Sequence, residues 1–179
     1  GVPIEIVVVD DGSTDGTADL VEARPEAGRD GDGRPRLRVL RIAHGGKGAA
    51  VRAGAMAATG DLVVFADSDM ATPPDQLPLL TEALADHDIA LGSRVQPDGS
   101  DRRASQPLYR RMLGKVFHWL AAVWVTGPVP DSQCGFKGFD GAVARELFGA
   151  TRINGFAFDA EVIYVAQTFG YRIGDLPVT

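Results

Sequence analysis

The sequence predicts an α/β protein whose mostly parallel sheet is flanked by helices. Short apolar runs rich in Val and Ile alternate with segments of helical pattern, and this alternation is typical of βαβ units with parallel strands. The chain has 179 residues, of which 45% are hydrophobic and 23% are charged. That is enough for the core of one domain, so we expect a single domain over residues 1–179.

The chain is expected to start with a strand over Ile4–Val9, a run dominated by β-branched residues. The strand ends at two acids, and a glycine-containing turn follows. A helix is expected over Ala18–Ala23, with Ser13 or Thr14 as its N-cap. The polar residues 24–36 are expected to form a loop.

The middle of the chain continues the alternation. Strands are expected over Leu37–Ile42, Leu62–Ala66 and Ile89–Leu91, each an apolar run between polar or turn-forming residues. A helix of small residues is expected from the glycine-rich loop at 44–48 through about Ala58. A second helix is expected over Pro74–Ala85, because proline is favoured in the first turn of a helix.

The C-terminal part is expected to contain three helices and one strand. An amphipathic to apolar helix is expected over Leu108–Val125, and an irregular segment over Gly127–Gly138. Shorter helices are expected at about Ala142–Leu147 and Phe158–Phe169, before a last strand over Tyr171–Leu176. Both ends of the chain have the character of cuts through a larger protein.

Charge and cysteine content exclude some classes of function. The net charge of −6 argues against general nucleic-acid binding, because phosphate backbones attract basic proteins. Cys134 is the only cysteine, so no internal disulfide can form, which is typical of a reducing compartment. No apolar run approaches the roughly 18 residues of a membrane-spanning helix.

An acid-x-acid pattern occurs three times, but only once directly after a strongly β-forming run. The three pairs are Asp30/Asp32, Asp67/Asp69 and Asp86/Asp88. The pair at 67/69 is expected at the carboxyl edge of the sheet, where open α/β sheets bind ligands. Two carboxylates there suit Mg²⁺ or Mn²⁺ on a diphosphate. A strand-end turn with exposed acids is an equally good interpretation of the spacing alone.

The loop from Asp11 to Glu22 has a competing interpretation as a calcium loop. Acids fall at loop positions 1, 5, 9 and 12, with glycine at position 6. The context opposes it, because such a loop follows a helix and this one follows a strand. Asp10 and Asp11 are instead expected to accept hydrogen bonds from a base or a ribose.

Two further features remain open. The sequence His-Gly-Gly-Lys-Gly at 44–48 fits neither the Walker A nor the dinucleotide pattern, and it is either a nucleotide-contacting loop or a tight turn. Basic residues gather at Arg94, Arg102, Arg103, Arg110, Arg111 and Lys115. This cluster is either a solvated helix face or a surface for lipid phosphate and membrane.

Several motifs together resemble the family 2 glycosyltransferases with the GT-A fold. They are VVDDGSTDGT at 8–17, HGGKG at 44–48, ADSD at 66–69 and GSR at 92–94. The elements DSQCGFK at 131–137 and FAFDAE at 156–161 are more specific, and resemble the dolichyl- or polyprenyl-phosphate β-glucosyltransferase branch. The resemblance runs from about Ile4 to Val178 but lacks the first strand of the family, so the domain is expected to be truncated at its N-terminus. The membrane anchor of many members is also absent from the sequence.

The resemblance implies a role for each matching residue. The implied donor site comprises Asp10, Asp11, Lys47 and Asp67 for the nucleotide sugar, with Asp67 and Asp69 for Mg²⁺ or Mn²⁺. The implied acceptor and catalytic residues are Arg94 and Arg110 for a phosphate, and Asp131, Asp159 and Arg94 for catalysis, with Gln133 and Glu161 nearby.

The implied reaction is inverting transfer of glucose from UDP-glucose to a polyprenyl phosphate at the cytoplasmic face of a membrane. A phosphate acceptor is largely dianionic at neutral pH, because its second pKa is about 6, so the need for a general base is small. Alternatives are a GDP-mannose-dependent polyprenyl-phosphate mannosyltransferase and a family 2 transferase with a soluble acceptor. A calcium- or nucleotide-binding module without catalysis belongs to a different class.

Overall fold

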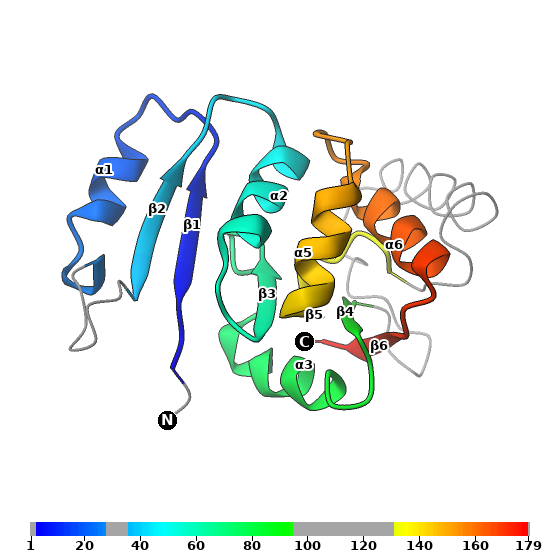
Figure 1. The fold of residues 1–179 in the computed structure, drawn as a ribbon. Coiled ribbons are helices and arrows are strands. Elements are labelled where there is room, and N and C mark those ends of the chain that lie inside the picture. Colours follow the sequence, from blue (N-terminus) through cyan, green and yellow to red (C-terminus); the bar gives the residue numbers. More distant parts are fainter. Residues whose placement is uncertain (1–2, 28–35, 95–130, 179) are drawn as a thin grey trace, which may run out of the picture.

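The computed structural model describes residues 3–27, 36–94 and 131–178, and the expected helix over Leu108–Val125 lies outside them. The elements alternate along the chain as expected (Figure 1). The strands are β1 (Ile6–Asp10), β2 (Leu37–Arg41), β3 (Leu62–Ala66), β4 (Ile89–Ser93), β5 (Phe136–Asp140) and β6 (Ile173–Pro177). The helices are α1 (Thr17–Glu22), α2 (Lys47–Ala57), α3 (Leu77–Ala83), α5 (Gly141–Ala150) and α6 (Phe158–Phe169), with short 3-10 turns η1 (Pro25–Ala27) and η2 (Pro74–Gln76).

The strands form two hydrogen-bonded sheets. Strands β1 and β2 pair in parallel, while the second sheet has the order β3-β5-β4-β6. Within it β4 and β6 are parallel, and β5 runs antiparallel to both of its neighbours. The predicted parallel pairing therefore holds for β1–β2 and β4–β6, and the one reversed strand lies at the centre of the second sheet.

Strand β5 begins inside the segment Gly127–Gly138, which was expected to be irregular, and that expectation is wrong for residues 136–138. The five residues Phe-Lys-Gly-Phe-Asp contain a glycine and a lysine, two residue types that are depleted in strands. Both faces of β5 are nevertheless covered, since Phe136 and Lys137, which point to opposite faces of the strand, are 3% and 1% exposed. Burial from distant parts of the chain thus overrides the weak local preference.

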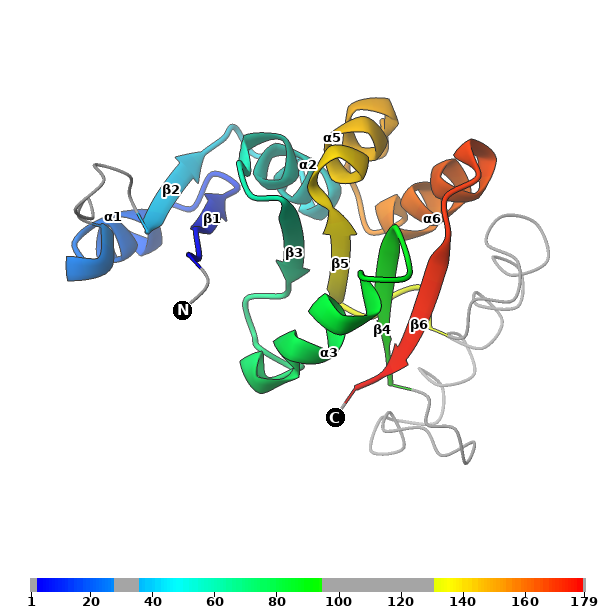
Figure 2. The same ribbon diagram turned by 60° about the horizontal axis from the view of Figure 1, so that its bottom comes forward.

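Helices cover both faces of the second sheet (Figure 2). In β4, Ile89 and Leu91 belong to one apolar cluster and Ala90 to another, and alternate residues of a strand point to opposite faces. The first cluster includes residues from α2, α5 and α6, whereas the second includes Leu80 of α3. The core is therefore divided between two helical layers with the sheet in the middle.

Helix α1 begins differently from the prediction. Gly16, in a left-handed conformation with φ of 82°, precedes its first residue, and no side chain caps the helix. Ser13 and Thr14 are thus not its N-cap. The carboxylate of Asp15 instead accepts a hydrogen bond from the Thr17 amide at 3.0 Å, within the turn that leads into the helix.

The two sheets meet without hydrogen bonds between them. Strand β1 lies beside β3 in Figure 2, but among the described residues β1 pairs with β2 alone and β3 with β5 alone. Helix α2 packs against both β1 and β3 and so joins the sheets. In the described parts of the chain, no helix combines the length and the apolar character needed to cross a bilayer.

Candidate functional site

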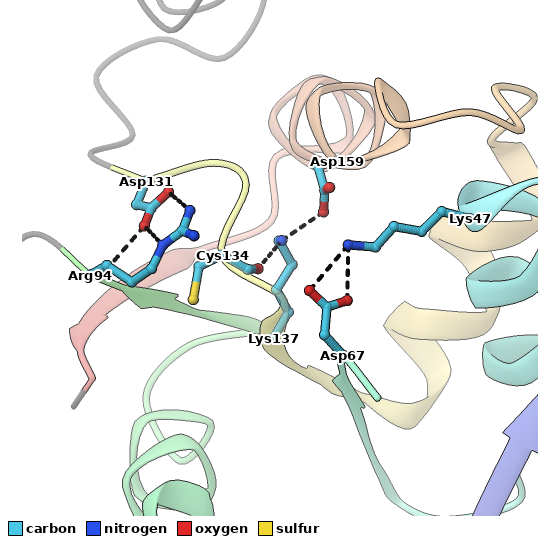
Figure 3. A network of polar contacts seen from close by, with 7 residues as sticks. All are labelled: Lys47, Asp67, Arg94, Asp131, Cys134, Lys137 and Asp159. Atoms are coloured by element: carbon cyan, nitrogen blue, oxygen red, sulfur yellow. Dashed lines mark hydrogen bonds and ion pairs between the residues drawn. The ribbon is translucent and has the colours of Figure 1, made fainter. Parts of the chain in front are cut away.

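The candidate site lies at the edge of the second sheet where β3 and β4 end. Because β5 is antiparallel to both strands, and Phe136 at its start pairs with Ala66 at the end of β3, residues after β3, after β4 and before β5 meet there. This geometry brings together Asp67, Arg94 and the segment 131–135 (Figure 3). Strand direction thus explains why Asp67, which was expected at a sheet edge, lies near Arg94 and residues 131–135.

An ion pair joins Asp67 to the start of α2. The Lys47 Nζ lies 2.9 Å from Oδ1 and 3.2 Å from Oδ2 of Asp67, and both side chains are about one third exposed or less. Lys47 is the first residue of α2, and Asp67 directly follows β3. The ammonium therefore faces both carboxylate oxygens of a residue predicted to hold metal.

Gly135 lies against the other side of the same carboxylate. Its carbonyl accepts a hydrogen bond from the Asp67 amide at 2.9 Å. A Cβ added at position 135 would lie 1.9 Å from Oδ2 and 2.2 Å from Cγ of Asp67. Only glycine leaves room for the carboxylate in this position.

Asp69 follows in a tight turn at the rim of a pocket. Its carboxylate accepts a hydrogen bond from the Ala71 amide at 3.0 Å, and Met70 between them has a φ of 50°. The pocket is lined by Asp67, Asp69, Ala71, Thr72, Arg94, Cys134 and Gly135.

This donor set fits Mg²⁺ or Mn²⁺ held jointly with a substrate. The described residues contain no cluster of three or more acidic, histidine or cysteine side chains suited to a metal. Mg²⁺ usually binds one or two carboxylates plus substrate phosphates rather than an all-protein cage. Two carboxylates on one pocket match that requirement, and the remaining ligands would come from a diphosphate and water.

Arg94, which also lines this pocket, forms an ion pair with Asp131 through two hydrogen bonds. The Arg94 Nε and Nη2 donate to the two Asp131 oxygens at 2.7 and 2.9 Å, and the Arg94 amide donates at 3.1 Å. Asp131 is 2% exposed, whereas the Arg94 side chain is 33% exposed. The buried carboxylate thus fixes a guanidinium that lines the pocket.

A second lysine–aspartate pair is almost completely buried. The Lys137 Nζ lies 2.6 Å from Oδ1 of Asp159 and also donates to the Cys134 carbonyl. Burial raises the pKa of Asp159, and the Lys137 ammonium opposes this rise. The sequence interpretation gave Lys137 no role, although a lysine inside an apolar run was the available signal.

The ring of Phe65 lies close to both lysines. Lys47 and Lys137 place their Nζ atoms 5.6 and 5.9 Å from its centroid, and the Lys47 Nζ lies 5.9 Å from the centroid of Phe158. Both ammonium groups are thus within range of an aromatic ring face.

Asp10 and Asp11, predicted to contact a nucleotide, make hydrogen bonds within the protein. Asp10 is buried and accepts from the Ser13 amide at 3.3 Å. Asp11 accepts from the amides of Gly45 and Gly46 at 2.7 and 2.8 Å, and these bonds lower its pKa. Asp11 therefore fastens the glycine-rich loop to the end of β1.

Further backbone groups of the glycine-rich loop are satisfied by the segment before α6. The Asn154 carbonyl accepts from the Gly48 and Ala49 amides at 2.7 and 3.3 Å. Glu161, noted near the predicted catalytic acid, accepts from the amides of Arg152 and Ile153 at 2.9 and 2.8 Å. Glu161 thus supports the segment that holds the start of α2.

Two expectations remain, the phosphate role of Arg110 and the calcium interpretation of the loop from Asp11 to Glu22. Arg110, predicted to bind a phosphate, lies outside the described residues. In the calcium-like loop, Asp19 and Glu22 both pair with Arg41, at 2.5 and 2.8 Å, and Asp11 faces the glycine-rich loop. Asp19 and Glu22 thus share a basic partner while Asp11 binds backbone amides elsewhere, so these acids do not converge on one ion, which opposes the calcium interpretation.

Comparisons with known sequences agree with these motifs. A model of glycosyl transferase family 2 matches residues 2–148. The dolichyl-phosphate beta-glucosyltransferase of Drosophila melanogaster is 35% identical over 182 residues, which cover 97% of this chain and 54% of that protein. Its Homo sapiens counterpart is 32% identical over 181 residues, covering 97% and 55%. The chain thus spans about half the length of these relatives.

Solved structures confirm the fold class. Glucosyl-3-phosphoglycerate synthase of Mycobacterium tuberculosis, in complex with Mn²⁺, UDP-glucose and phosphoglyceric acid, has a TM-score of 0.66 at 22% identity, over 96% of this chain and 57% of that one. Mannosyl-3-phosphoglycerate synthase of Rubrobacter xylanophilus has a TM-score of 0.62 at 21% identity, over 97% and 54%. At these identities the likeness shows the fold alone, a GT-A-like α/β fold.

Proposed function

Because the chain belongs to glycosyl transferase family 2, we propose that it is part of an inverting transferase that moves glucose from UDP-glucose to a dolichyl-type polyprenyl phosphate. The observation that carries this proposal is the similarity to dolichyl-phosphate beta-glucosyltransferases over 97% of the chain at 32–35% identity. The more distant solved structures share the fold at 21–22% identity. The acceptor class is therefore taken from the nearer relatives.

The donor would bind at the end of β3. Asp67 and Asp69 would hold Mg²⁺ or Mn²⁺, which would neutralise the charge that develops on the departing UDP. The same pocket wall carries Thr72 and Cys134, which would lie beside the diphosphate or the sugar. The complex of the mycobacterial synthase with Mn²⁺ and UDP-glucose supports this use of the fold.

The acceptor phosphate would approach the pocket from the side of Arg94. A guanidinium held at two points by a buried carboxylate is pre-organised, and arginine binds phosphate well in such a fixed orientation. Arg110 would assist from the segment outside the described residues. A phosphate oxygen would then attack the anomeric carbon from the face opposite the leaving UDP, and the configuration would invert.

This chemistry needs little help from a base. A phosphate monoester is largely dianionic at neutral pH, since its second pKa is about 6. The Asp131 carboxylate is committed to Arg94, and Asp159 to Lys137. We therefore assign Asp131 to positioning the acceptor site, and Asp159 to orienting the sugar rather than to proton removal.

The complete domain would include a further strand between the two sheets. In the described parts of the chain, β1 and β3 share no backbone hydrogen bonds with each other, although α2 packs against both strands. Ile6 and Leu62, in these two strands, are 53% and 43% exposed, and an inserted strand would cover apolar surface there. The assembled enzyme would work at the cytoplasmic face of a membrane, where the polyprenyl tail of its acceptor is embedded.

A panel of substrates tests the proposal with the full-length protein. UDP-glucose and GDP-mannose are each offered with a polyprenyl phosphate and with 3-phosphoglycerate, and transfer is measured with and without Mn²⁺. We expect Mn²⁺-dependent transfer from UDP-glucose to the lipid phosphate, and loss of UDP binding in Asp67→Asn and Asp69→Asn. Transfer only to 3-phosphoglycerate, transfer only from GDP-mannose, or unchanged Mn²⁺ and UDP binding in both variants would overturn the assignment.

A further inference from the structure

The ammonium of Lys47 contacts the carboxylate that is assigned to the metal ion. It lies within hydrogen-bonding distance of both Asp67 oxygens, at 2.9 and 3.2 Å. An oxygen that donates a lone pair to a divalent cation loses much of its capacity to accept from a nearby ammonium, and the two positive charges also repel. Lys47 and a metal ion therefore compete for one carboxylate.

The competition is strengthened by the way Asp67 is held. The carboxylate is bounded by Gly135, where even one additional carbon would lie 1.9 Å from Oδ2. The Asp67 amide is fixed to the Gly135 carbonyl at 2.9 Å. With Asp67 confined on this side, the simplest way for an ion to gain the carboxylate is for the long, flexible lysine side chain to move.

Two aromatic rings already lie near the Lys47 ammonium and would still be near it after a small movement away from Asp67. The Lys47 Nζ lies 5.6 and 5.9 Å from the centroids of Phe65 and Phe158, and ring faces attract a cation without using a carboxylate oxygen. The neighbouring Asp159 also interacts electrostatically with Lys47. Release from Asp67 therefore does not leave the ammonium without a favourable contact.

The backbone of the same loop has fewer groups to offer a phosphate. The amides of Gly45 and Gly46 donate to Asp11, and those of Gly48 and Ala49 donate to the Asn154 carbonyl. In a phosphate-binding loop, such amides would point to the ligand. With these four amides engaged, the ammonium of Lys47 is a group of the loop that can be transferred to a diphosphate.

We propose that Lys47 couples metal binding to donor binding by opposing a divalent cation at Asp67 until a nucleoside diphosphate accepts its ammonium. This inference rests on the proposed function, since it takes the metal and the diphosphate donor from there. Linkage requires the coupling to be reciprocal, so the ion and the nucleotide each raise the affinity for the other. The ion would thus enter mainly together with the donor.

Calorimetric titration of Mn²⁺ into the full-length protein, without and with saturating UDP, tests the coupling without using activity. For the unmodified protein, we expect UDP to raise Mn²⁺ affinity by about tenfold or more, within the usual range of coupling between sites. In Lys47→Met, Mn²⁺ should bind about tenfold more tightly without UDP, and the gain on adding UDP should shrink. Lys47→Arg keeps the charge and should retain most of the coupling.

Arg145→Met is the matched control, because it also removes one positive charge but from an exposed site on α5, where Nη1 lies 3.5 Å from the Ala58 carbonyl. It should leave both Mn²⁺ affinities unchanged. Equal or weaker Mn²⁺ binding by Lys47→Met without UDP would show that Lys47 only orients Asp67, and would overturn the inference. Absence of UDP and Mn²⁺ binding in the unmodified protein would instead contradict the proposed function.

Discussion

Gly135 and Asp67 are packed so closely that the main chain at one defines the carboxylate position of the other. A Cβ at position 135 would lie 1.9 Å from Asp67 Oδ2, far inside van der Waals contact. The contact partner is a short side chain with few alternative rotamers, and Lys47 holds it from the other side at 2.9 Å. The pocket geometry therefore depends on a residue that has no side chain of its own.

Gly135→Ala should disable donor binding more than it harms folding. The added methyl group must displace the Asp67 carboxylate, and a shift of about 1 Å can cost about a hundredfold in activity. Overpacking of this kind should lower the free energy of unfolding by about 1–3 kcal/mol. Calorimetry with UDP and Mn²⁺, together with urea unfolding, separates the two effects.

Gly149→Ala is the matched control for that substitution. Nothing lies within 4 Å of a Cβ at position 149, which is in helix α5, and alanine is favoured over glycine in helices by about 1 kcal/mol. The control should bind UDP and Mn²⁺ normally and be slightly more stable. Normal donor binding by Gly135→Ala would refute the steric role of Gly135.

Asp131→Asn should affect the acceptor rather than the donor. The carboxylate accepts from Nε, Nη2 and the backbone amide of Arg94, and an amide replaces one of its oxygens with a donor. Arg94 should lose its fixed orientation, raising KM for polyprenyl phosphate by about tenfold or more, while KM for UDP-glucose changes little.

Steady-state kinetics with each substrate varied separately check this expectation. Asp86→Asn removes an exposed carboxylate in the turn after α3 and should change neither KM. If kcat for Asp131→Asn collapsed while KM for the acceptor stayed constant, Asp131 would be acting on the chemical step instead of positioning Arg94.

The strands that carry the acids were predictable because their signals are local. Residues 6–10, 37–41 and 62–66 form strands within one or two residues of the expected bounds, since each is built on a short apolar run between polar or turn-forming residues. The residues that follow such strands can be placed at the sheet edge for the same reason. Asp67 was expected at the carboxyl edge of the sheet, and it lines one pocket together with Arg94.

The site contacts that were not predicted depend on residues that are distant in the sequence. The burial of Lys137 in β5 is accompanied by a partner 22 positions away, Asp159, and no local periodicity indicates that pairing. Likewise, Asp11 was expected to face a ligand, but its oxygens meet the amides of Gly45 and Gly46. Such pairings arise only when the strands and loops have been assembled.

The buried Lys137–Asp159 pair should show strong non-additivity in stability. Removing one partner leaves an uncompensated charge, so Lys137→Met or Asp159→Leu should each lower the free energy of unfolding by about 3–5 kcal/mol at neutral pH. The double variant Lys137→Met/Asp159→Leu leaves no buried charge and should recover most of the loss. Urea unfolding of all four proteins completes the double-mutant cycle, and simple additivity would contradict the pairing.

The cost of Lys137→Met should also depend on pH. Burial already raises the pKa of Asp159 above its ordinary value of 3.8, and loss of the ammonium should raise it further. A raised pKa in the folded state favours folding at pH below the unfolded value and loses this contribution as the pH rises through the folded value. The variant should therefore be closest to the unmodified protein in acid, and a deficit independent of pH would argue for a purely steric effect.

Asp11 should stabilise the glycine-rich loop at neutral pH and lose this effect in acid, which is the opposite of the pH dependence expected for Asp159. Hydrogen bonds from the Gly45 and Gly46 amides lower its pKa below the ordinary value of 3.8. A lowered pKa means that the contribution of the carboxylate is present above the unfolded value and is lost as the pH falls through the folded one. Protection of these two amides from hydrogen exchange should thus persist at neutral pH and fall in acid below about pH 4.

A substitution at position 11 tests at constant pH whether the Asp11 carboxylate protects the Gly45 and Gly46 amides from hydrogen exchange. Asparagine has only one acceptor oxygen, so Asp11→Asn should reduce the protection of one glycine amide by about tenfold at neutral pH. Asp15→Asn is the control, since Asp15 also has a lowered pKa but bonds Thr17 rather than the glycine-rich loop. Because Lys47 directly follows Gly46 in this loop, Asp11→Asn should also weaken UDP binding. Unchanged amide protection in Asp11→Asn would show that the loop is held mainly by Asn154.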